Sequence, residues 1–206
     1  MLRRCLMPPI PESAQAAELL SSAADALLAG DMASAEQDIR AADFRSLRNY
    51  SYLLCGPISL AIHRQAHYPK YPPIQTRDTA RMPSRSDERR VYARDGYRCR
   101  YCSSRVVLKE ARNAFRAAFP STARWGRTNE EKHFGLATLT ASLDHVHPFR
   151  RGGTNDEQNL VTACGPCQFG RVHWTLEEVE IDDPRSFAPV VDGWDGLGRL
   201  QVKKLA

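Results

Sequence analysis

The stretch LDHVHPFRRGGTNDEQNLVTACGPCQFGR, residues 143–171, decides the fold of this chain. Apolar and polar residues alternate over residues 138–146, a pattern that predicts a β-strand. Residues 150–159 are rich in turn-forming side chains, and the apolar pair that follows them suits a second strand. We therefore expect two strands joined by a polar loop, with an acid and an imidazole, Asp144 and His145, side by side near the end of the first strand.

Four of the six cysteines form two C-x-x-C pairs, Cys99 with Cys102 and Cys164 with Cys167. In a reducing compartment such pairs favour a metal over disulfide bonds. One pair alone is also typical of a redox motif. Two pairs indicate a single zinc site, because zinc prefers a tetrahedron of thiolates and each pair supplies half of one. Four sulfur ligands leave no open coordination position, so we expect the zinc to be structural.

Composition narrows the class of protein. The 206 residues are 42% hydrophobic and 26% charged, which is typical of a soluble globular chain. No apolar run is long enough to cross a bilayer, and the N-terminal residues lack the apolar core of a signal peptide, so a cytoplasmic location is expected. The net charge of +5 is uneven, since residues 81–101 carry seven arginines against three acids, whereas residues 12–44 carry seven acids and one arginine. The basic middle of the chain is expected to face a polyanion.

Helical spacing and breaking residues divide the chain into four parts. A helical region is expected over residues 1–68, a proline-rich linker over 69–83, the cysteine-containing domain over 84–181 with a helical insertion at 103–137, and an acidic, glycine-rich tail over 182–206. The individual helices are predicted over residues 12–29, 32–43, 45–67, 87–94, 108–119 and 129–137. Ser86 and Asn129 are the expected N-caps of the fourth and sixth helices, and a capping box of Thr175 and Glu178 predicts one more short helix.

The cysteine pairs and the acid–imidazole pair together resemble the HNH endonuclease family, in the zinc-knuckle branch with a ββα-metal core. The features that carry the resemblance are Arg94-Asp95-Gly96-Tyr97 before the first cysteine pair, Asp144-His145 with Pro148, Gly152-Gly153, and Asn159-Leu160 before the second pair. They extend over residues 84–181 and leave out the N-terminal helices. The resemblance implies an α+β fold, in which a ββα-metal core is stabilised by the four-cysteine zinc site and preceded by a helical region.

The resemblance also implies roles for individual residues. His145 would be the general base that activates water, a task suited to imidazole because its ordinary pKa is about 6.5. Asp144 would coordinate a catalytic Mg²⁺ or Mn²⁺, and Asn159 would hold the loop and so orient the histidine. The family usually has His or Asn directly after the last cysteine as a further metal ligand, and Gln168 stands there. An amide oxygen is a weaker ligand than imidazole, and His173 is a reserve ligand.

DNA is the expected partner. Five arginines are candidates for phosphate contacts, which give affinity without base preference. They are Arg98, Arg100, Arg150, Arg151 and Arg171.

Two other functions compete with a DNA endonuclease. The first is a zinc-stabilised DNA-binding protein whose nuclease centre is degenerate and inactive, a hypothesis that Gln168 keeps open. The second is a zinc scaffold for protein partners, which would lack salt-sensitive DNA binding. In each case the N-terminal helices could bind a partner or a second copy of the chain.

Overall fold

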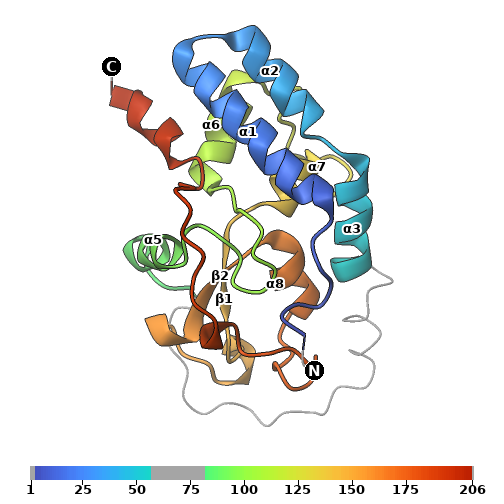
Figure 1. Cartoon of the computed structure of the whole chain (residues 1–206), viewed down its shortest axis with the longest axis vertical. Coiled ribbons are helices and arrows are strands. Elements are labelled where there is room, and N and C mark those ends of the chain that lie inside the picture. Colours follow the sequence, from blue (N-terminus) through green and yellow to red (C-terminus); the bar gives the residue numbers. More distant parts are fainter. Residues whose placement is uncertain (1–2, 57–81, 206) are drawn as a thin grey trace.

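The computed structural model describes residues 3–56 and 82–205, and the side chains of residues 3–56 and 82–201. Within these ranges the fold is α+β, with helices around a small two-stranded sheet (Figure 1). The helices are α1 (Pro11–Ala29), α2 (Met32–Ala41), α3 (Arg45–Cys55), α5 (Arg85–Arg94), α6 (Lys109–Ala118), α7 (Phe134–Thr138) and α8 (Gly165–Arg171). The strands are β1 (Ser142–His145) and β2 (Leu160–Ala163), and four 3₁₀ helices are η1 (Phe149–Arg151), η2 (Glu157–Asn159), η3 (Pro184–Ser186) and η4 (Gly198–Leu205).

The N-terminal helices form where their capping residues predict them. Gly30 ends α1 in the left-handed conformation, and its N–H bonds back to the last turn. Asp31 then begins α2, because its side chain accepts a hydrogen bond of 3.0 Å from the N–H of Ser34. The third predicted helix is present as α3, up to Cys55. The rest of that prediction, and nearly all of the proline-rich linker, lie outside the described residues.

Two predicted N-caps are wrong. Ser84, not Ser86, caps α5 through a capping box with Asp87. His133, not Asn129, caps α7, because its ring accepts a hydrogen bond from the N–H of Leu136 at 3.1 Å.

Two predicted elements also differ from the structure. The strand predicted over residues 138–146 begins only at Ser142, because Thr138 still belongs to α7. The capping box of Thr175 and Glu178 forms, with bonds of 2.9 and 3.3 Å. A turn over residues 176–180 follows it instead of a helix, and Glu180 takes a positive φ that lies outside the helical region.

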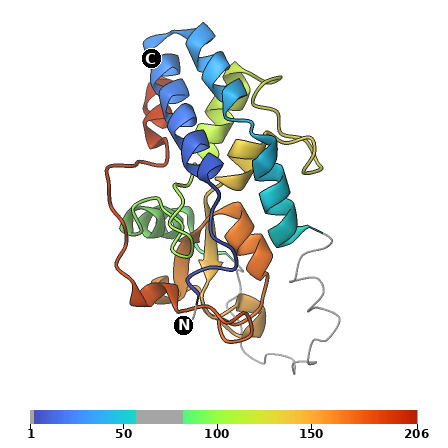
Figure 2. The ribbon, with the colours of Figure 1, turned by 45° about the vertical axis from the view of Figure 1, so that its right-hand side comes forward.

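The sheet lies between two helices. β1 and β2 pair antiparallel, with Asp144 opposite Val161 and His145 opposite Leu160. α5 packs against β2, and α8 packs against β1 on one side and α3 on the other (Figure 2). The N-terminal helices therefore support the helix that carries the second cysteine pair.

One hydrophobic core joins the N-terminal helices to the hairpin. Its fully buried members come from α1, α2, α3, α5, α6, α7 and both strands, and include Leu20, Leu47, Leu136, Leu143 and Leu160. The C-terminal segment returns to the same core, where Leu197 is also fully buried. Its Trp194 donates a hydrogen bond of 2.8 Å from Nε1 to the carbonyl of Val106. Among the described residues, no helix combines the length and the apolar character that a membrane crossing requires.

Candidate active site and metal centre

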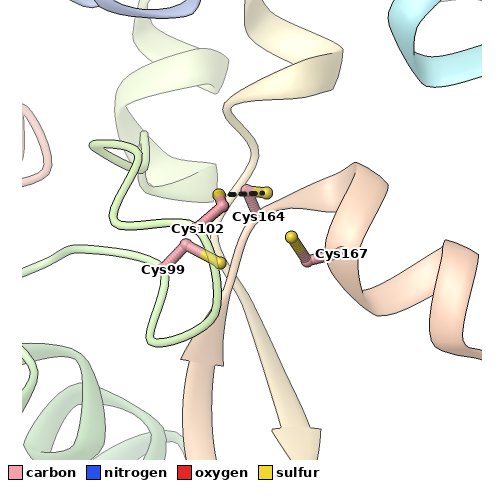
Figure 3. Close-up of side chains that lie close together, drawn as sticks. All are labelled: Cys99, Cys102, Cys164 and Cys167. Carbon is pink, nitrogen blue, oxygen red and sulfur yellow. Dashed lines mark hydrogen bonds between the residues drawn. The ribbon is translucent and has the colours of Figure 1, made fainter. Parts of the chain in front are cut away.

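The four cysteines of the two C-x-x-C pairs meet at one end of the hairpin (Figure 3). Cys99 and Cys102 lie on the turn after α5, where the N–H of Cys99 bonds to the carbonyl of Ser104 at 2.8 Å. Cys164 is the N-cap of α8, and Cys167 lies in its first turn. The four sulfur atoms lie within 4.8 Å of one another, and Cys102 and Cys164 are 3.6 Å apart.

This geometry fits a tetrahedral metal such as zinc. Sulfurs bound at about 2.3 Å to a common zinc ion lie about 3.8 Å apart, close to the observed spacing. Hydrogen bonds from the other thiols, first of all Cys164, lower the pKa of Cys102, whereas the contact with Cys102 raises the pKa of Cys164 and of Cys167. Four thiolates this close together would repel one another, so the cluster needs a cation to hold them. Within the described ranges it is the one group of three or more His, Cys, Asp or Glu side chains close enough to hold a metal.

Asp144 lies on the face of β1 toward α8, where it is buried in an ion pair. Its Oδ2 accepts hydrogen bonds from Arg171, at 2.9 Å from Nε and 2.7 Å from Nη2. The hydroxyl of Tyr101 donates to the same oxygen at 2.8 Å. Burial, and next the charge of Asp144, raise the pKa of Tyr101, so its hydroxyl remains a donor.

His145, the next residue, contacts a different set of groups. Its Nε2 lies 2.9 Å from Oδ1 of Asn155, and its ring lies beside Phe149 with centroids 5.5 Å apart. Adjacent strand residues point to opposite faces, so the side chains of Asp144 and His145 bond to different groups. The imidazole is held on the loop side of the hairpin, while the carboxylate is held against α8.

Asn159 fastens the loop that joins the two strands. Its Oδ1 accepts a hydrogen bond from the N–H of His147 at 2.8 Å, and its Nδ2 donates to the carbonyls of His147 at 3.1 Å and Thr154 at 2.9 Å. The two glycines explain the tight path of this loop. Gly152 takes a φ of 98°, and a Cβ on Gly153 would lie 1.8 Å from the carbonyl oxygen of His147.

The side chains of Gln168 and Asp144 are engaged by different partners. The side-chain oxygen of Gln168 accepts a hydrogen bond from the hydroxyl of Ser142, and its Nε2 donates to the carbonyl of Leu143 at 2.8 Å. Both ends of the amide are thus used on β1, and Oδ2 of Asp144 is used by Arg171 and Tyr101. This set of donors and acceptors does not fit a divalent cation held by Asp144 and Gln168 jointly.

The five arginines predicted to contact phosphate differ in their surroundings. Arg150 is exposed on η1. Arg98 and Arg151 pair with Asp192 and Glu178. Arg171, which is 1% exposed, and the buried Arg100 pair with Asp144 and Asp95. The guanidinium groups of Arg171 and Arg100 are thus enclosed by the protein, and phosphate contact by the five arginines stays a prediction.

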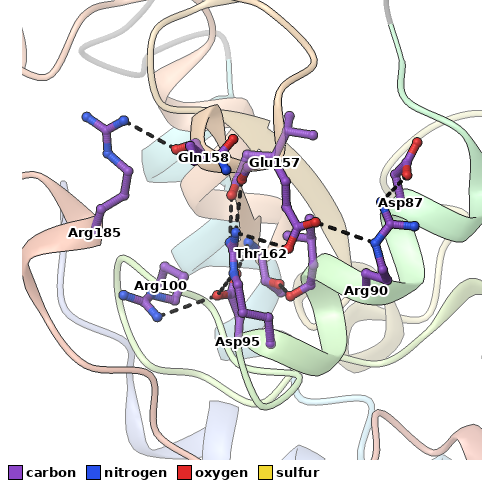
Figure 4. Close-up of polar contacts among 11 residues, drawn as sticks. Asp87, Arg90, Asp95, Arg100, Glu157, Gln158, Thr162 and Arg185 are labelled. Carbon is purple, nitrogen blue, oxygen red and sulfur yellow. Dashed lines mark hydrogen bonds and ion pairs between the residues drawn. The ribbon is translucent and has the colours of Figure 1, made fainter.

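Sequence reasoning missed the role of Asp95, which anchors the second strand (Figure 4). Its fully buried carboxylate accepts a hydrogen bond from the N–H of Thr162 at 2.7 Å, and Arg94 and Arg100 also donate to it. The carboxylate thereby links the turn before the first cysteine pair to β2. The motif Arg-Asp-Gly-Tyr was visible in the sequence, but nothing in it indicated this long-range contact. The roles of Tyr101 and Asn155 were missed as well. Tyr101 bonds to Asp144, which is 43 positions away, and Asn155 bonds to His145, which is 10 positions away.

These features define a small α+β unit in which the turn after α5 and the start of α8 form a four-cysteine cluster, and the hairpin carries a buried acid–imidazole pair. The family model described as HNH endonuclease matches residues 131–168, so an HNH endonuclease domain is present in this part of the chain. The match includes β1, the loop, β2 and the first half of α8. No curated protein and no solved structure matched the chain. The HNH match indicates a nuclease acting on nucleic acids.

Proposed function

We propose that the chain is an endonuclease of the zinc-knuckle HNH branch that hydrolyses phosphodiester bonds of DNA. The observation that carries the proposal is the position of His145 within the HNH match, at the end of β1 and beside Asn155. The cysteine cluster would hold a structural zinc that keeps the turn after α5 on the start of α8. A cytoplasmic location suits this site, because thiols stay reduced there.

His145 is the proposed general base. With Oδ1 of Asn155 as acceptor, Nε2 of the imidazole carries the proton, and Nδ1 keeps a lone pair. Nδ1 can then take a proton from water as the water oxygen attacks phosphorus. The bond from phosphorus to the leaving sugar oxygen breaks, and that oxygen takes a proton from solvent. The products are one phosphate-terminated and one hydroxyl-terminated end. Asn155 acts as a positioning residue, because it sets the tautomer of the base.

The loop supplies the remaining parts of the proposed site. Asn159 holds the backbone at His147 and Thr154, and this contact keeps η1 and the base in a constant arrangement. The exposed Arg150 on η1 is the proposed phosphate contact nearest to the base along the chain. A phosphate contact of this type predicts binding that weakens as salt increases.

Plasmid nicking tests the proposal. Zinc-loaded protein is incubated with supercoiled DNA, with and without Mg²⁺ or Mn²⁺, beside His145→Ala and the control His147→Ala. His147 is the exposed neighbour, and its ring contacts the carbonyl of Arg151 instead of Asn155. We expect His145→Ala to lower the rate by about 100-fold or more, the typical contribution of a general base, and His147→Ala to retain most of it. Equal nicking by wild type and His145→Ala would contradict the proposed role.

A DNA-binding protein with an inactive centre is the second candidate. The amide of Gln168, used at both ends on β1, and the ion pair on Asp144 favour it. DNA retardation that weakens with salt, without cleavage under any of these conditions, would support this candidate. A zinc scaffold for proteins would show neither result. Association through the N-terminal helices stays a prediction, which sedimentation of the zinc-loaded chain would test.

A further inference from the structure

Arg171 stands where the HNH resemblance implies a catalytic cation. Both Nε and Nη2 of its guanidinium bond to Oδ2 of Asp144, at 2.9 and 2.7 Å, and Tyr101 donates to the same oxygen. Oδ2 thus accepts three hydrogen bonds, two of them from a permanently charged group. The carboxylate is neutralised by a residue of the chain itself.

The guanidinium is also fixed by the backbone around it. Nη1 donates to the carbonyl of Trp174 at 2.6 Å and to that of Val146 at 3.3 Å, and Nη2 donates to the carbonyl of His145. The residue is 1% exposed. Moving Arg171 out of this position would take a donor from each of these carbonyls and the counter-charge from a buried carboxylate, which is costly. The arginine is therefore a permanent part of the fold around β1 and α8.

A divalent cation on Asp144 would have to lie beside this fixed positive charge. Repulsion between like charges is several-fold stronger inside a protein than in water, because the effective dielectric constant is lower. The other expected ligand offers no compensation, since both ends of the Gln168 amide are bonded to β1. Charge and ligand supply therefore both disfavour a cation at this position.

We propose that Arg171 replaces the catalytic cation of the family in this chain, so that Asp144 does not recruit Mg²⁺ or Mn²⁺. It follows that any DNA cleavage proceeds without an added divalent cation, a consequence that rests on the proposed nuclease function. The binding part of the inference does not depend on catalysis and can be measured by itself.

Mn²⁺ binding to the zinc-loaded chain, followed by electron paramagnetic resonance, tests the inference. The proteins are wild type, Arg171→Gln, Arg171→Gln with Asp144→Asn, and Arg151→Gln. Arg151 is the matched control, because it too is nearly buried and pairs with a carboxylate, that of Glu178 at 2.9 Å. Zinc content is measured in each sample, so that the cysteine cluster remains filled.

We expect wild type and Arg151→Gln to show no saturable Mn²⁺ site up to about 1 mM, the weak end of the affinity range. Arg171→Gln should gain a site at least about tenfold tighter, and the added Asp144→Asn should remove it. Saturable binding by wild type, or no gain in Arg171→Gln, would overturn the proposal. Should Arg171→Gln fail to fold, Arg171→Met keeps the buried aliphatic volume. Should both fail, Mn²⁺ broadening of the His145 ring signals in wild type would overturn the inference, and its absence would support it.

Cleavage assays separate this inference from the proposed function. Nicking by wild type in a chelator, with zinc content unchanged, supports both. Nicking that requires Mg²⁺ or Mn²⁺ and disappears in Asp144→Asn supports the nuclease and overturns the role of Arg171. If no condition gives cleavage, the proposed function fails, and the Mn²⁺ titrations still decide the inference.

Discussion

Removal of the Asn159 side chain should release the loop that carries the base. Three hydrogen bonds disappear in Asn159→Ala, one from the N–H of His147 and two to the carbonyls of His147 and Thr154. Each contributes about 1 kcal/mol net, so the free energy of unfolding should fall by about 3 kcal/mol. Asn159→Asp keeps the acceptor and loses both donors, so we expect a loss of about 2 kcal/mol.

Urea unfolding of the zinc-loaded chain measures these losses, and amide exchange of residues 147–154 shows where they act. The N–H of His147 should exchange faster in Asn159→Ala, because its acceptor is gone. Gln158→Ala is the matched control, since Gln158 is the exposed neighbour on the same 3₁₀ helix. If Asn159→Ala stays within about 0.5 kcal/mol of wild type and exchange at His147 is unchanged, other contacts hold the loop and our reasoning is wrong.

Three further predictions concern the metal centre, a buried histidine and a glycine. Cys164→Ser should lose the zinc, as measured by metal analysis, and unfold at a lower temperature than wild type. Cys5→Ser should keep one zinc per chain, because Cys5 lies outside the cluster and burial raises the pKa of its thiol to about 11. Zinc loss from both variants would contradict this assignment. Burial lowers the pKa of His133 below its ordinary value of about 6.5, so the unfolded chain binds this proton more tightly. The contribution of this neutral ring to the free energy of unfolding should be fully present above about pH 6.5 and fall as the pH drops below that value. Urea unfolding at several pH values should therefore show a steeper fall for wild type than for His133→Gln. An equal fall in the two proteins would contradict the burial of His133. Gly153→Ala should cost about 2–3 kcal/mol in the same assay, because its Cβ would meet the carbonyl oxygen of His147, and a cost near zero would refute the close approach.

The elements that depend on neighbouring residues could be predicted from the sequence. The boundary between α1 and α2 follows from Gly30 and Asp31, whose contacts reach only a few positions along the chain. The same holds for the two halves of the cysteine cluster, because C-x-x-C spacing places two sulfurs on one turn. Asn159 also bonds within its own loop. Predictions failed where two local signals competed, as with Ser84 and Ser86 before α5.

The charged contacts of the site could not be predicted in this way. Asp144 was expected to bind a cation, and its partners in the structure are Tyr101 and Arg171, which are 43 and 27 positions away. Arg171 was expected to contact phosphate, and burial made it a partner of Asp144 instead. The C-terminal tail was predicted only as an acidic, glycine-rich segment. In the structure Leu197 and Trp194 pack it against the core, a contact that its composition did not indicate. None of these pairs has a characteristic spacing in the sequence.

The sequence by itself determined which chemical groups the chain carries, where α1 ends and α2 begins, and that four thiols belong to one site. These properties rest on caps, turns and spacings that act over a few residues. Only the tertiary structure decided which charge neutralises Asp144 and which side His145 faces. The reason is that an ion pair inside a protein forms between groups that packing brings together, and packing depends on every segment at once.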